Sequence, residues 1–142
     1  MAKKYVTGFG EAALLLKELP SRVENRVLQQ ATTKAARVIA REVRASAPKG
    51  QGKQSPSSQK YGRLSRNIGV QALRNAKRRG QRGSRVWTKN AFWALFLEFG
   101  TKFIQPRPWF RPAVERSKDK ATEVLAEELA IGIDREARKL AK

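Results

Sequence analysis

Seven apolar residues recur at steps of three and four between two prolines, and this stripe constrains the fold more than any other feature. They are Val23, Val27, Ala31, Ala35, Val38, Ile39 and Val43. The spacing places them on one face of a helix of about seven turns. Pro20 precedes this helix, and Pro48 disfavours helical geometry in the residue before it. Ser21 and Glu24 have the S-x-x-E spacing of a capping box, so we expect a helix from Ser21 to about Ala47.

Two further helices are expected near the ends of the sequence. Gly10 to Leu19 reads as a short helix, which Pro20 ends. Pro112 fits the first turn of a long final helix. The apolar stripe of that helix is Val114, Ala121, Leu125, Leu129, Ile133, Ala137 and Leu140. The same segment contains most of the acidic residues of the chain.

The middle of the chain has a different pattern. Apolar residues alternate at Ile68, Val70 and Ala72, which predicts a strand, and 84–88 is its expected hairpin partner across a polar turn. A short amphipathic helix is predicted next, with Gly100 at its C-terminal cap. Its apolar positions are Phe92, Leu95, Phe96 and Phe99.

Two segments are expected to lack regular structure. Residues 48–60 are rich in Gly, Ser, Gln and Lys, which predicts a flexible loop. Residues 101–112 contain three prolines and are predicted to form an extended arm. Together the elements predict an α+β fold in a single domain, 1–142: a long N-terminal helix, a small antiparallel sheet with a basic hairpin, a short aromatic helix and a long C-terminal helix.

Positive charge is concentrated in the middle of the sequence. The chain has 31 Lys and Arg against 12 Asp and Glu, a net charge of +19. No acid occurs between Glu42 and Glu98, where thirteen Lys and Arg occur. The densest group is the hairpin, 74–85, whose cations are expected to face DNA and bind its backbone without base preference: Arg74, Lys77, Arg78, Arg79, Arg82 and Arg85. The alternative is that these cations are an ordinary solvated surface.

Several classes of function are disfavoured by composition. The chain has no histidine and no cysteine, so an ordinary catalytic triad, a histidine metal site and a disulfide are all excluded. We therefore expect no enzyme activity, no cofactor and no metal. Met1 to Gly10 lacks the apolar run of a signal peptide, and no stretch approaches the ~20 apolar residues that cross a bilayer. A soluble protein that is not exported is expected.

Two motifs carry a resemblance to a known family. The segment 93–101 reads W-A-L-F-L-E-F-G-T, and 106–113 reads P-R-P-W-F-R-P-A. The earlier segments A-S-A-P at 45–48, G-R-L at 62–64 and N-I at 67–68 precede them in order. Residues 14–114 thus resemble the head-tail joining or tail-completion proteins of siphophages. The tryptophan before Phe110 and the strongly basic hairpin depart from that pattern.

The resemblance implies an architectural role in the virion. It implies a homo-oligomeric ring, guessed as a hexamer, in the phage neck between portal-side head connector proteins and the tail tube or tail terminator, with genomic double-stranded DNA in its lumen. The expected subunit interface is Glu98, Phe99, Gly100, Thr101, Pro106, Pro108, Trp109, Phe110, Arg111 and Pro112.

Other readings of the same residues remain open. The Glu98 carboxylate could bond nearby backbone instead of a neighbouring subunit, and Trp109 and Phe110 could roof the core. A tail terminator ring, or a free non-specific nucleic-acid-binding protein, are the alternative functions. No membrane contact is expected.

Overall fold

The computed structural model describes Gly10, Leu14, Lys17 and residues 19–49, 62–73 and 82–141. Two long helices dominate these residues, α2 (Ser21–Ser46) and α5 (Phe110–Leu140). Between them in sequence lie the 3-10 helix η1 (Leu64–Asn67), strands β1 (Ile68–Ala72) and β2 (Ser84–Thr88), and the short helix α4 (Ala94–Phe99). The α+β fold predicted from the sequence is confirmed.

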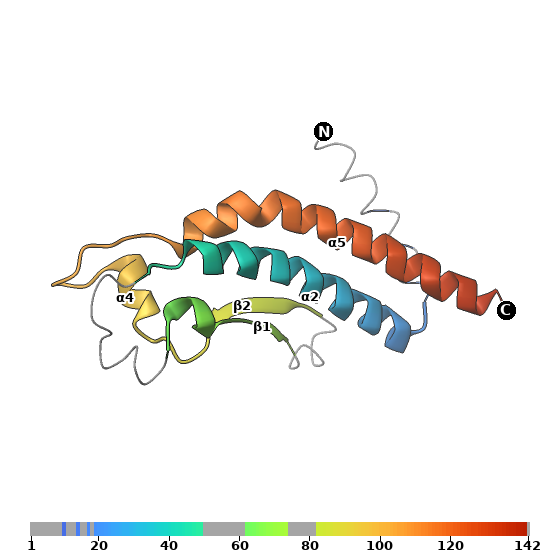
Figure 1. Ribbon diagram of the computed structural model, residues 1–142. Coiled ribbons are helices and arrows are strands. Elements are labelled where there is room, and N and C mark those ends of the chain that lie inside the picture. The colour runs from blue at the N-terminus through green and yellow to red at the C-terminus, as the bar shows by residue number, and fades with distance from the viewer. Residues whose placement is uncertain are drawn as a thin grey trace.

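The elements form three layers with α2 in the middle (Figure 1). Helix α5 runs antiparallel to α2 along one side, and the β1–β2 hairpin lies along the opposite side. Close approach of the helices depends on Gly132, because a Cβ there would lie 2.6 Å from Cγ1 of Val27. The helix α4 and the segment after it lie at the end of the molecule opposite the C-terminus.

Helix α2 begins at Ser21 as predicted, but its cap differs from the prediction. Pro20 is the N-cap residue, and its carbonyl accepts the N–H groups of Val23 at 2.8 Å and Glu24 at 3.0 Å. No side chain caps the helix, so the capping box predicted for Ser21 and Glu24 is wrong. Ser21 is already helical, which places its hydroxyl one position too far along the chain to act as the cap.

Several predicted elements have the expected form. Strand β1 pairs antiparallel with β2, with Ile68 opposite Thr88, and Ile68 is buried. Helix α5 begins at Phe110, which leaves Pro112 in its first turn. Gly10, Leu14 and Lys17 are helical, while the rest of the predicted N-terminal helix, nearly all of the 48–60 loop and residues 74–81 of the hairpin lie outside the described residues.

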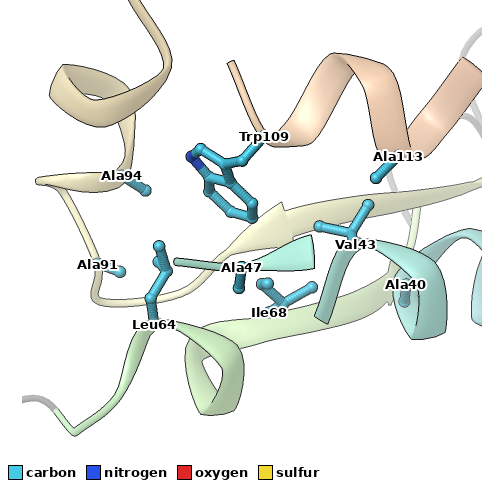
Figure 2. Close-up of a cluster of buried hydrophobic side chains, with 9 residues drawn as sticks. All are labelled: Ala40, Val43, Ala47, Leu64, Ile68, Ala91, Ala94, Trp109 and Ala113. Carbon is cyan, nitrogen blue, oxygen red and sulfur yellow. The ribbon is translucent and has the colours of Figure 1, made fainter. Parts of the chain in front are cut away.

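Two groups of buried side chains hold the layers together. The larger one brings Val43 of α2, Leu64 of η1 and Ile68 of β1 against Trp109 and Ala113 at the start of α5 (Figure 2). The smaller one joins Val27 and Ala31 of α2 to Leu129 of α5. Apolar contacts within each group exclude water and supply the non-directional part of the stabilisation.

Ion pairs add to the contact between α2 and α5. The buried Glu136 carboxylate accepts hydrogen bonds from Arg26 at 2.7 Å and Lys139 at 3.1 Å. These bonds outweigh burial and lower the pKa of Glu136 below its ordinary value. Lys34 pairs with Glu128 at 2.6 Å. Within the described residues, no helix is long and apolar enough to cross a membrane.

Candidate interaction surface

The apolar stripe of α4 points to solvent. The buried positions of α4 are Ala94 and Glu98, and Leu97 packs against the core, whereas its other large apolar residues are exposed. Together with two residues of the following segment they form what we call the aromatic surface: Phe92, Leu95, Phe96, Phe99, Phe103 and Ile104, which are 43 to 90% exposed. Exposed apolar residues gathered in one place mark interaction sites more often than singly scattered ones do.

Glu98 fixes the base of this surface to the long C-terminal helix. Its Oε2 accepts the backbone N–H groups of Trp109 at 2.7 Å and Phe110 at 2.9 Å, and its Oε1 accepts that of Arg111 at 3.1 Å. The first N–H groups of a helix have no partner within the helix, so Glu98 caps α5 from a distant part of the sequence. This is the backbone role considered for Glu98 from the sequence.

The protonation of Glu98 depends on this geometry. Burial raises the pKa of the carboxyl group, but the three backbone hydrogen bonds and the nearby charge of Arg111 together outweigh it and lower the pKa below its ordinary value. Glu98 is therefore ionised at neutral pH, and its negative charge faces the positive end of the α5 dipole.

A tight turn then directs the chain outward. Gly100 has φ +74°, and a Cβ there would lie 2.8 Å from both the Ile104 carbonyl oxygen and the Pro106 nitrogen. The Thr101 N–H donates to the Ile104 carbonyl at 2.8 Å, and the Thr101 hydroxyl accepts the N–H groups of Phe103 and Ile104. The turn returns to α4 where the Arg107 N–H donates to the Leu97 carbonyl at 2.9 Å.

The segment after the turn places its two large aromatic residues differently from its prolines and arginines. Trp109 is buried in the larger core cluster (Figure 2), and Phe110 is half-buried against the same cluster with its ring edge-on to Trp109 at 5.6 Å. No described residue accepts the Trp109 Nε1–H. The exposed members of the predicted interface are Phe99, Thr101, Pro106, Pro108, Arg111 and Pro112.

Cations border the aromatic surface. The Arg111 guanidinium lies 4.9 Å from the centre of the Phe99 ring, and the Lys102 ammonium lies 6.0 Å from that of Phe103. Arg107 is also exposed. An aromatic centre with arginine at its margin is the composition that protein interfaces favour.

The basic hairpin is described only at its base. Arg82 Nε donates to the Asn25 side chain at 2.9 Å, which ties the end of the hairpin to α2. The Arg85 guanidinium donates to Gln71 and lies 5.1 Å from the centre of the Trp87 ring. Arg74, Lys77, Arg78 and Arg79 lie outside the described residues.

Comparison with known proteins places this arrangement in a family. Residues 14–100, more than half of the chain, match the family HK97-gp10_like, described as "Bacteriophage HK97-gp10, putative tail-component". The chain belongs to the HK97-gp10-like family. Membership makes it a phage tail component, part of the virion, and the description names a structural part and no catalytic activity. No curated protein and no solved structure matches the chain.

The HK97-gp10-like match covers α2, the hairpin and α4 and ends at Gly100, so the turn, the arm and α5 lie beyond it. Phe92, Leu95, Phe96, Phe103 and Ile104 were not among the interface residues expected from the sequence. Helical spacing identified the stripe on α4 but carries no information on whether a stripe faces the core or solvent.

Among the described residues, no cluster of three or more carboxylates could hold a metal ion.

Proposed function

We propose that the chain is one subunit of a ring in the phage neck, which joins the head connector to the tail tube and surrounds the DNA channel. Residues 1–142 act as one unit in this ring, and six copies are the proposed number. The observation that carries the proposal is the aromatic surface, which is exposed and yet held in place by Glu98 and Gly100. A surface that is both apolar and preorganised is suited to permanent association, because little entropy is lost when it binds.

A second copy of the chain supplies a complementary charge. Four exposed acids of α5 occur every four residues and so share one face: Glu115, Asp119, Glu123 and Glu127. The cations at the margin of the aromatic surface are Lys102, Arg107 and Arg111. Two copies of a +19 chain repel each other unless acids of one lie near cations of the other. A head-to-tail contact between these two faces achieves this, and repetition of such a contact closes a ring.

Mass measurement on the purified protein tests the ring. Phe96→Ser with Phe103→Ser should convert the assembled wild type to monomer with an unchanged melting temperature, since both side chains are exposed. Leu140→Ser is the matched control, because Leu140 is 68% exposed at the far end of α5. If the doubly substituted protein still assembles, the aromatic surface is not part of the subunit interface.

The position in the virion needs a particle assay. In a phage that carries the Phe96 and Phe103 substitutions, full heads and tails of normal length should accumulate without joining. Tails of abnormal length would instead indicate a tail terminator, and normal virions would contradict a role at the joint altogether.

A further inference from the structure

A second group of cations lies on the described part of the molecule, apart from the tip of the hairpin. It comprises Arg37, Arg41 and Arg44 of α2, Arg63 and Arg66 at η1, and Lys89 after β2, and we call it the basic tract. We propose that the basic tract binds the phosphate backbone of duplex DNA. The inference rests on the proposed function for the source of the DNA, which is the genome in the channel.

The three arginines of α2 form one exposed line. They occupy positions i, i+4 and i+7, and all three side chains are exposed. The rise of 1.5 Å per residue separates the first from the last by roughly 10 Å along the helix axis. Phosphates of one DNA strand advance about 3.4 Å along the duplex axis per nucleotide, so this line has the length of about three phosphate steps.

Backbone contacts join this line to the other cations. Arg44 donates from Nε and Nη2 to the Ile68 carbonyl at 3.2 and 3.0 Å, which places it at the start of β1. Arg66 precedes Ile68 by two residues. The Lys89 N–H donates to the Asn67 carbonyl at 2.7 Å, and the Lys89 side chain passes over Gly69. These contacts place the Arg44 side chain and the Lys89 backbone at the start of β1, close in sequence to Arg66, while the Lys89 side chain lies on the sheet face that points away from α2.

Among the described residues no ion pair neutralises the basic tract, in contrast to other cations of the same helix. Arg26 and Lys34 of α2 pair with acids of α5. No ion pair with a described acid involves Arg37 or Arg41, and Arg44 bonds a neutral carbonyl. The nearest acid in sequence, Glu42, pairs with Arg116 of α5 at 3.0 Å. Uncompensated cations raise the local potential and attract a polyanion.

The surroundings of the tract favour backbone contact over base reading. Helix α2 is covered by α5 on one side and by the sheet on the other, so it cannot enter a major groove as a recognition helix does. Guanidinium groups match phosphate oxygens in two parallel hydrogen bonds, which makes exposed arginines suited to this ligand.

The test compares two triple variants with the same loss of charge. Arg37→Gln, Arg41→Gln and Arg66→Gln remove half of the tract but leave Arg44 in place. Arg22→Gln, Lys120→Gln and Arg138→Gln remove three exposed cations outside it. Glutamine keeps helix propensity, so both variants should fold like the wild type. Affinity is measured by fluorescence anisotropy on two unrelated DNA duplexes over a series of salt concentrations.

We expect the tract variant to reduce the magnitude of the log–log salt slope by about 2 to 3, since each phosphate contact contributes about 0.9. The control should change it by less than about 1, and both duplexes should give the same values. Equal slopes for the two triple variants, or a loss confined to one duplex sequence, would overturn the proposal. The proposal would also be overturned if the tract substitutions changed the salt slope for duplex RNA or an acidic protein but not for duplex DNA.

Mass measurement on the same samples separates this inference from the proposed function. If the wild type binds DNA through the basic tract but stays monomeric, the proposed ring is contradicted and DNA binding by the tract still stands. If the wild type forms rings and the tract substitutions leave DNA affinity unchanged, DNA binding by the basic tract is contradicted and the proposed ring still stands.

Discussion

Glu98, Phe99, Gly100 and Thr101 each have a separate physical task, although they are consecutive in sequence. Glu98 caps a helix that begins twelve residues later, Gly100 permits a turn with φ +74°, and Thr101 closes that turn with its hydroxyl and its N–H. Phe99 is left outside, where Arg111 lies against its ring. One short motif therefore builds part of the core and part of the surface.

The clearest prediction at this scale concerns Glu98. Glu98→Ala removes the acceptor of three backbone N–H groups and should lower the free energy of unfolding by about 2 to 3 kcal/mol at neutral pH, measured by urea denaturation. Glu98→Gln keeps one acceptor oxygen at the same place and should lower the free energy of unfolding by less.

The same pair of proteins tests the protonation of this residue. The pKa of Glu98 is lowered in the folded state, so its stabilisation is complete above the ordinary value of 4.5 and is lost as pH falls through the lower folded value. The wild type should therefore lose stability on acidification more steeply than Glu98→Gln does. If both proteins lose stability equally as the pH falls, the Glu98 carboxylate is not the cause of the acid sensitivity.

At the scale of elements, the periodicity of apolar residues predicted the type and the approximate bounds of each element. The stripe of α2, the alternation in β1 and the segment of α5 each gave an element of the right type and nearly the right bounds. The start of α2 at Ser21 was right, but the capping box was wrong, because only the backbone shows that Pro20 takes the cap position.

Direction in space was harder to predict. The α4 stripe faces outward because Glu98 must face inward to reach α5, and that contact joins residues eleven to thirteen positions apart. The spacing of the four apolar residues of the α4 stripe does not reveal this contact between Glu98 and α5. Trp109 had two possible roles in the sequence, and its burial beside Ala113 and Val43 gives it the core role.

The contact between α2 and α5 can be tested at Gly132. A methyl group there would meet Val27, which is buried and β-branched, so Gly132→Ala should lower the free energy of unfolding by about 1 kcal/mol or more even though alanine favours helix. In a double-mutant cycle, Val27→Ala should relieve part of that loss. Additive losses would show that the two side chains do not compete for the same space.

At the scale of the whole molecule, charge is sorted by direction. Acids of α5 neutralise the cations of α2 that face them, while no ion pair between described residues involves a cation of the basic tract, and no acid occurs in the sequence between Glu42 and Glu98. A molecule sorted in this way can associate with its own kind through one face and with a polyanion through another.

The hairpin gives the prediction at this scale. Replacement of Arg78, Arg79 and Arg82 by Ser should reduce the magnitude of the salt slope for duplex DNA by about 2 to 3, with no base preference. Mass should stay that of the wild type, and the melting temperature should fall only by the loss of the Arg82–Asn25 hydrogen bond. If the substitutions abolish docking to other virion proteins while the DNA slope is unchanged, these cations bind an acidic protein surface instead.

The dependence of α4 on Glu98 also sets an order of events. A helix of six residues is too short to persist by itself in water, and α4 is tied to the rest of the chain through the start of α5. In a nascent chain whose long helices have not yet paired, the phenylalanines of α4 have no fixed arrangement to offer a neighbour. In the proposed ring, subunits should thus recognise one another only after each has finished folding, which should keep incomplete chains out of the growing particle.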